Sequence, residues 1–135
     1  MFFKKVDKSE ELIKTAALLI HAAKIDQNYS KEEEKIIKQT LLKIGAYPEN
    51  IEEIIIKAKK KEEDSNQILD FTREVKNMNE VKKIEIIETL WRIIYSNKEV
   101  DIYEANLMRR LAGLLYIDSK IMGNIKEKIK KENKK

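Results

Sequence analysis

The chain has 135 residues, 42% hydrophobic and 39% charged, with three Gly, one Pro and no Cys. This length suits one domain that can bury roughly two thirds of the surface exposed by the unfolded chain. Abundant Lys, Glu, Ile and Leu with so few turn-forming residues favour helices and exclude a sandwich or barrel, which needs frequent turns. The lack of Cys excludes a disulfide framework and a thiolate metal site.

The formal net charge of +4 lies entirely in the last ten residues, which hold six Lys and two Glu. The rest of the chain carries equal numbers of basic and acidic residues. A nucleic-acid-binding domain concentrates cations on a folded face, often with aromatic residues among them. We therefore predict no nucleic-acid partner, a single domain over residues 1–130, and a basic flexible tail over residues 131–135.

No apolar run approaches the roughly 20 residues that a bilayer-crossing helix needs. The start of the chain, MFFKKVDKSEE, lacks the long apolar stretch and the cleavage site of a signal peptide. We therefore expect a cytoplasmic protein with no transmembrane segment.

Apolar residues at helical spacing predict a first helix over about 9–24. A second helix opens at Ser30, which forms a Ser-x-x-Glu capping box with Glu33, and ends near Gly45. Pro48 fits the first turn of a third helix. The polar run KAKKKEEDSN that follows predicts a surface link.

A fourth helix is expected from about Ser65, and Asn79 begins a fifth that is apolar around most of its circumference. A helix of that kind belongs in the centre of a domain. Asp101 and Glu104 cap a sixth helix, and a seventh starts at about 118. The pattern predicts an all-α fold.

The two halves of the chain repeat at a distance of 71 residues. A one-residue slip then shifts the pairing in the later part of each half. The repeat predicts a compact globule of about seven helices with an internal pseudo-repeat of helical hairpins. The matching pairs are Leu19 with Leu90, Ala23 with Ile94, Asp26 with Asn97, Ser30 with Asp101, Glu33 with Glu104 and Ile36 with Leu107, then Ile44 with Leu114 and Ile51 with Ile121.

The repeated motif is AKIDQNYSKEE over 23–33 and IYSNKEVDIYE over 94–104. It resembles the motif of the TerB tellurite-resistance family, which reads roughly Ala-x-Ala-Asp-Gly-x-x-(Asp/Ser)-x-x-Glu twice per domain. The resemblance covers about residues 9–130. The chain departs from it at Gln27 and Lys98, which stand where the family has Gly.

The resemblance implies an all-helical domain linked to stress response and divalent cations and, in DjlA N-terminal-like relatives, to a membrane-tethered DnaJ-like co-chaperone. It implies a protein partner and peripheral membrane association through that partner. Two functions stay open. One is a non-catalytic TerB-like module for stress response or protein interaction with weak divalent-cation binding. The other is a helical adaptor or co-chaperone-type interaction domain with no metal function.

Oxygen-bearing side chains gather in both copies of the motif and form a candidate metal site. An EF-hand is excluded, because counting from Asp26 puts Lys31 where that loop needs Gly and Ile37 where it needs Glu. Oxygen ligands favour calcium, magnesium or manganese, and no cofactor is required. The candidate ligands are Asp26, Asn28, Ser30 and Glu33 in the first copy and Asn97, Glu99, Asp101 and Glu104 in the second.

The same residues also fit plain helix capping, in which Ser30 with Glu33 and Asp101 with Glu104 satisfy unpaired backbone N–H groups. The second copy is the weaker cation site, because Asn97 replaces an acid and Lys98 adds a positive charge. Both interpretations remain open.

Catalytic chemistry has little support in the sequence. His21, the only histidine, lies in the apolar stretch ALLIHAAKI, where a hydrogen-bonded core residue is commoner than a base. No nucleophile–base set and no glycine-rich phosphate loop can be assembled. We predict that the protein is not an enzyme and has no catalytic residue.

Overall fold

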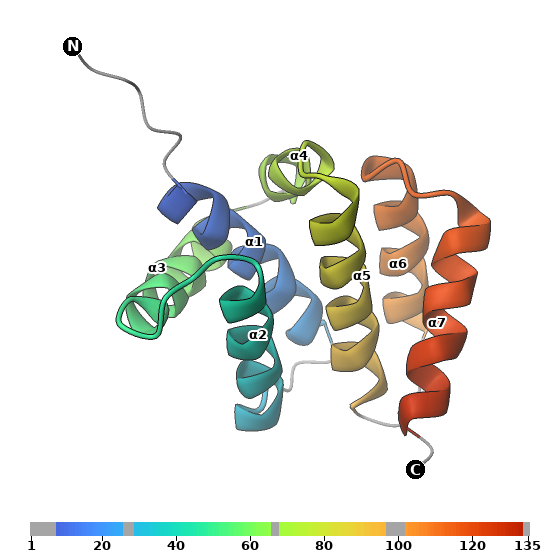
Figure 1. Cartoon of the computed structure of the whole chain (residues 1–135), viewed down its shortest axis with the longest axis horizontal. Coiled ribbons are helices and arrows are strands. Elements are labelled where there is room, and N and C mark those ends of the chain that lie inside the picture. The colour runs from blue at the N-terminus through green and yellow to red at the C-terminus, as the bar shows by residue number, and fades with distance from the viewer. Residues whose placement is uncertain (1–7, 26–28, 66–67, 97–101, 134–135) are drawn as a thin grey trace.

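The computed structural model describes residues 8–25, 29–65, 68–96 and 102–133. These residues form seven α-helices and no strand, which confirms the all-α prediction (Figure 1). No helix among them is long and apolar enough to span a membrane. The helices are α1 (Lys8–Ala23), α2 (Lys31–Lys43), α3 (Ile51–Asp64), α4 (Leu69–Lys76), α5 (Glu80–Tyr95), α6 (Ile102–Leu114) and α7 (Ser119–Asn133).

Helices α1 and α5 form the centre of the domain. Helix α1 packs against α2, α3, α4 and α5, and helix α5 packs against α1, α2 and α7 (Figure 1). Both helices carry apolar side chains on most of their faces, so each can bury itself only by being surrounded. The predicted burial is confirmed for Leu19, Ile20, Leu90, Trp91 and Ile94, none of which is more than 4% exposed.

The internal repeat is a feature of the fold. Helix α6 begins and ends 71 residues after α2, and α5 and α7 are the counterparts of α1 and α3. The packing of α1 on α3 is matched by that of α5 on α7. Helix α4 has no counterpart and lies between the two halves in the chain. The prediction of a pseudo-repeat of helical hairpins is thus confirmed.

The predicted one-residue slip in the repeat is wrong, because the 71-residue offset persists to the end of both halves. Ile121, the slipped partner of Ile51, is 38% exposed. An apolar neighbour at the slipped position made both registers equally plausible from sequence, and only burial separates them. The buried pairs in the true register are Ile44 with Leu115, Ile51 with Met122, Ile54 with Ile125 and Ala58 with Ile129.

The turns after α2 and α6 have the same hydrogen bonds, although their sequences differ. The Ala46 N–H donates to the Leu41 carbonyl and the Ile117 N–H donates to the Ala112 carbonyl, each at 2.9 Å. This six-to-one bond belongs to the Schellman motif, whose central residue takes a positive φ. Gly45 has φ +130° in the first turn, whereas Tyr116 has φ +57° in the second. The predicted end of helix two near Gly45 is confirmed.

Three predicted boundaries in the middle of the chain were wrong. The polar run expected to be a surface link is helical to Asp64, because Lys and Glu are strong helix formers and its side chains bind neighbouring helices. Pro48 lies in the turn before α3 and not in its first turn. Helix α4 begins at Leu69, later than Ser65. The predicted start of helix five at Asn79 is confirmed, since its side chain accepts a hydrogen bond from the Lys82 N–H.

The first residues of the segment predicted to be a flexible tail belong to the last helix. Helix α7 continues to Asn133, so residues 131–133 are helical. The Arg92 guanidinium donates to both carboxylate oxygens of Glu132, at 3.1 and 3.2 Å, which fastens this end of α7 to α5. Residues 134 and 135 lie outside the described part of the chain, and the rest of the domain division stays a prediction.

Replacing the central tryptophan should be costly. Trp91 is 4% exposed and its ring centroid lies 6.0 Å from that of Tyr95. We expect Trp91→Ala to lower the free energy of unfolding by about 3–5 kcal/mol, the usual loss when a large aromatic leaves a core. Trp91→Phe is the control and should lose clearly less, because it keeps a ring in the site. Denaturant unfolding measures both, and equal losses would contradict the buried position.

The left-handed residue after α6 allows a second test. A left-handed backbone costs a residue with a Cβ roughly 1–2 kcal/mol, but not glycine. We therefore expect Tyr116→Gly to be more stable than Tyr116→Ala by about 1 kcal/mol, since both lose the ring contact with Lys76 and differ only in the backbone. The order should reverse at Gly113, inside α6, where alanine should be the more stable. Thermal unfolding gives both differences, and the same sign at both positions would refute the backbone argument.

Candidate functional site

The two copies of the motif lie where one helix of each pair ends and the next begins. The last residues of α1 and α5 and the first residues of α2 and α6 lie toward the lower end of the molecule in Figure 1. Three of the candidate ligands lie in the described residues, namely Ser30, Glu33 and Glu104. The other five, Asp26, Asn28, Asn97, Glu99 and Asp101, lie outside them.

The capping box predicted at the start of α2 is confirmed. The Glu33 N–H donates to the Ser30 hydroxyl oxygen at 3.1 Å, and the Ser30 N–H donates to one carboxylate oxygen of Glu33 at 2.8 Å. Two backbone donors that the helix leaves unpaired are thereby satisfied. Only one of the two Glu33 oxygens is needed for this bond.

Both glutamates of the repeated motif are buried. Glu33 is 1% exposed and Glu104, 71 residues later, is 3% exposed, each in the first turn of the helix that follows its loop. Fully buried glutamates are rare unless paired, because taking a carboxylate out of water is costly. The positive end of the helix dipole offsets part of that cost. No group of three or more acidic or His side chains that could hold a metal occurs in the described ranges.

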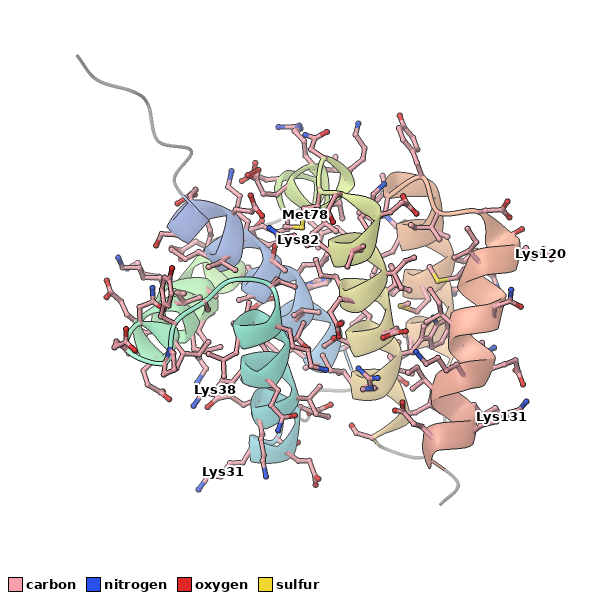
Figure 2. All side chains as sticks on the ribbon, in the orientation of Figure 1. Lys31, Lys38, Met78, Lys82, Lys120 and Lys131 are labelled. Carbon is pink, nitrogen blue, oxygen red and sulfur yellow. The ribbon has the colours of Figure 1, made fainter. Side chains whose placement is uncertain are left out.

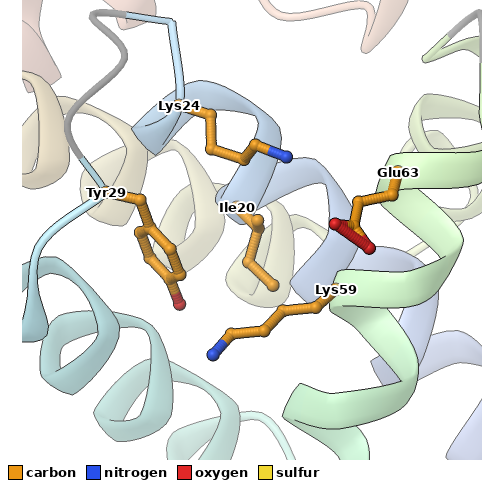
Figure 3. A pocket seen from close by; sticks show the side chains of 5 residues that line it. All are labelled: Ile20, Lys24, Tyr29, Lys59 and Glu63. Atoms are coloured by element: carbon orange, nitrogen blue, oxygen red, sulfur yellow. The ribbon is translucent and has the colours of Figure 1, made fainter.

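A pocket of about 480 Å³ lies next to the first loop (Figure 3). Ile20 and Lys24 reach it from the end of α1, and Lys59 and Glu63 reach it from α3. The four-residue spacing within each pair places both side chains on one face of their helix. Tyr29, just before the Ser30 cap, completes the wall, and its hydroxyl and the Lys59 ammonium lie on the same side of the pocket.

Glu34 is the centre of a polar network at this pocket. Its carboxylate accepts a hydrogen bond from the Tyr29 hydroxyl at 3.0 Å and lies 2.8 Å from the Lys59 ammonium and 3.5 Å from that of Lys38. The bond from Lys59 is the largest cause that lowers the pKa of Glu34. Burial, followed by the charge of Glu34, raises the pKa of Tyr29 well above its ordinary value. Tyr29 therefore keeps its proton and Glu34 its charge at neutral pH.

A second carboxylate ties the end of α1 to α3. Glu62 lies 2.6 Å from the Lys24 ammonium and 3.2 Å from Nδ1 of His21, and its side chain is 10% exposed. His21 is thus within hydrogen-bond distance of a carboxylate, in keeping with the structural interpretation of this residue. Both lysines that line the pocket are bound to carboxylates, Lys24 to Glu62 and Lys59 to Glu34.

Sequence analysis missed this network, because it placed the second half of α3 in a link. If KAKKKEEDSN is taken as helix, Glu62 falls on the same face of α3 as the fully buried Ala58, four residues earlier, and Lys59 falls at the edge of that face. The signal was present in the high helix propensity of Lys and Glu. Tyr29 had no such signal, since its role depends on tertiary contacts with Lys59 and Glu34.

The described residues form an all-α domain with two equivalent helix–loop–helix units, each with a buried glutamate after its loop. These features define a class of duplicated helical domain. The family model of tellurite resistance protein TerB matches residues 12–127. The chain therefore belongs to the TerB family, as its motifs predict. Comparison with curated proteins and with solved structures gives no match.

The polar network makes stability depend on pH through Glu34. Its pKa is lowered in the folded protein, so its contribution is present above the unfolded value of about 4.3 and is lost as pH falls through the folded value. We expect Glu34→Gln to lower the free energy of unfolding at pH 7 by about 1 kcal/mol, and the difference from wild type to shrink as pH falls below the unfolded value. Urea unfolding of wild type and Glu34→Gln, at a series of pH values from 7 downward, measures this difference in the free energy of unfolding.

Glu32→Gln is the matched control, because Glu32 is an exposed acid in the same first turn of α2. It should show little of the pH-dependent difference. A loss at pH 7 as large as that of Glu34→Gln would assign the effect to the helix dipole and not to the network.

Proposed function

We propose that the protein is a non-catalytic TerB-family module that binds a divalent cation weakly at its first loop and serves a stress-response or protein-interaction role. The observation that carries this proposal is the burial of Glu33 and Glu104 at equivalent positions after the two loops. A carboxylate in the first turn of the helix that follows a loop is well placed to contribute an oxygen ligand to a cation bound in that loop.

A capping box does not by itself require its glutamate to be buried. The Ser30–Glu33 box uses one carboxylate oxygen of Glu33, and a capping glutamate can do this at the surface of a helix. The proposal gives Asp26 and Glu33 the role of charged ligands, with Asn28 or Ser30 as neutral oxygen ligands. Such hard oxygen donors suit calcium, magnesium or manganese.

The charges around the first loop support a cation. Lys24 and Lys59 lie beside it, and each is bound to a carboxylate within 2.8 Å. Their repulsion of a divalent ion is thereby reduced, since each pair is close to neutral at a distance. The second loop is the weaker candidate, because its sequence has Asn97 and Lys98 where the first has Asp26 and Gln27.

The same contacts support a non-catalytic role. Tyr29 is held as a neutral phenol, and the lysines of the pocket are engaged in ion pairs, so none of them is prepared as a nucleophile or base. The alternative is a helical adaptor or co-chaperone-type domain whose caps are purely structural. The complete geometry of the Ser30–Glu33 box favours that alternative. Either role involves a protein partner, through which the domain associates peripherally with a membrane.

Titration calorimetry with calcium, magnesium and manganese tests the cation site. We expect a dissociation constant of about 10⁻⁴–10⁻³ M for calcium, in the range of weak sites with few charged ligands. Asp26→Ala should abolish the heat. Glu33→Gln should weaken binding while keeping the fold, because glutamine also serves in a capping box.

Asn97→Ala, at the equivalent position of the second loop, is the matched control and should bind as wild type does. Binding unchanged by Asp26→Ala would exclude the first loop. The lack of heat with every ion would leave capping as the whole role of these residues and would favour the adaptor.

A further inference from the structure

The exposed side of α6 differs from that of its counterpart in the repeat. Its first turn presents Ile102 and Tyr103, which are 69% and 71% exposed. Its next exposed residues include Arg109 and Arg110, and its only acid, Glu104, is buried. Large apolar and aromatic side chains beside arginines are the composition of protein-binding surfaces and not of ordinary solvated helices.

The equivalent side of α2 has a solvated character. The positions 71 residues earlier hold Lys31, Glu32 and Lys35 in place of Ile102, Tyr103 and Asn106. Lys38, the counterpart of Arg109, binds Glu34 and Glu52. The exposed side of the helix at this position of the repeat can therefore carry a mixture of basic and acidic residues. The composition of α6 is not required by its position in the repeat.

A groove of about 360 Å³ runs between this side of α6 and the end of α1. No acidic residue lines it within the described residues, and its apolar floor is formed by Ile25 and Leu107. We call it the α1–α6 groove. Its lining residues are His21, Ile25, Tyr103, Asn106, Leu107 and Arg110.

The cations of this surface lack acidic partners in the described chain. Elsewhere among the described residues, Arg73, Arg92 and many lysines form ion pairs. Arg109 and Arg110 form none with a described residue. Arg109 donates to the Asn106 side-chain oxygen at 2.9 Å, and this partner is neutral. The carboxylate nearest to His21, that of Glu62, is already bound to His21 and Lys24. The groove thus offers the guanidinium group of Arg110 beside an exposed aromatic ring, and that of Arg109 lies on the adjoining surface of α6.

We propose that the α1–α6 groove binds an acidic peptide segment of another protein. A carboxylate of that segment pairs with Arg110, whose planar fork matches carboxylate geometry. A neighbouring apolar side chain of the segment packs on Tyr103 and the floor of the groove. The volume of the groove fits one or two side chains, so the contact suits a short linear segment.

Charge complementarity favours a peptide over the other anionic partners. A nucleic-acid surface typically neutralises several phosphates, and a membrane-binding cluster typically has about 4–8 basic residues. This groove offers one arginine, with a second beside it, on a body that is charge-balanced outside the last ten residues. An arginine and a tyrosine are instead typical of the few residues that dominate a protein interface.

Fluorescence anisotropy with a labelled nonapeptide of alternating Glu and Leu tests the proposal. We expect saturable binding that weakens at least about fivefold in Arg110→Glu and in Tyr103→Ala, since one contact of 1 kcal/mol changes an affinity by about that factor. Lys120→Glu is the matched charge reversal, at the N-terminal end of α7 (Figure 2), and should bind as wild type does. Raising the salt should weaken binding, because the pairs are exposed.

The measurement is made in EDTA, which separates it from the proposed cation site. Peptide binding in EDTA supports the groove even if calorimetry finds no ion, and a failure of peptide binding leaves the calorimetric result untouched. The proposal is overturned by absent binding, by equal binding to Arg110→Glu, or by equal binding of a peptide with Lys in place of Glu. It is also overturned if only phosphatidylserine vesicles or single-stranded DNA respond to Arg110→Glu, because the groove would then be assigned to that partner.

Discussion

The packing of α1 against α5 is the contact on which the rest of the structure depends. Each of these helices is the inner member of a helical hairpin and is apolar around most of its circumference, so neither could be buried within its own hairpin. Pairing them joins the two halves and leaves the outer faces of both to be covered by α2, α3, α4 and α7. The duplication is therefore a way of closing one core and not a chain of independent units.

Side-chain contacts with glutamates join the outer helices to this centre near corresponding places in the two halves. His21 of α1 binds Glu62 of α3, and Arg92 of α5, 71 residues after His21, binds Glu132 of α7. Such partly exposed pairs contribute little free energy singly, in the range of about 0–1 kcal/mol. Their recurrence at the same point of both halves indicates that they orient the last turns of α3 and α7. Hydrophobic burial supplies most of the stability, and these pairs help to specify the geometry.

The two halves have diverged on their surfaces while keeping the same framework. The first half surrounds its loop with a network of compensated charges, centred on Glu34 and Glu62. The second half has Lys98 in its loop and an exposed aromatic and arginine surface on α6. The two halves therefore do not carry two equivalent sites. This asymmetry is the basis for proposing a cation at the first loop and a protein segment at the α1–α6 groove.

The sequence by itself determined the helical class, the central helices, the repeat, the capping box at Ser30 and the TerB family. The structural features among these rest on local propensity or on periodicity, which neighbouring residues carry, and the family rests on the resemblance of the repeated motif. Tertiary structure decided three further features, namely the register of the repeat beyond α2, the extent of α3 and the helical end of α7. Apolar residues at adjacent positions, and polar runs of Lys and Glu, fit two descriptions until burial and partners are known. The pocket network and the α1–α6 groove were beyond sequence reasoning for the same reason, since they join residues from helices that meet only when α1 and α5 pack together.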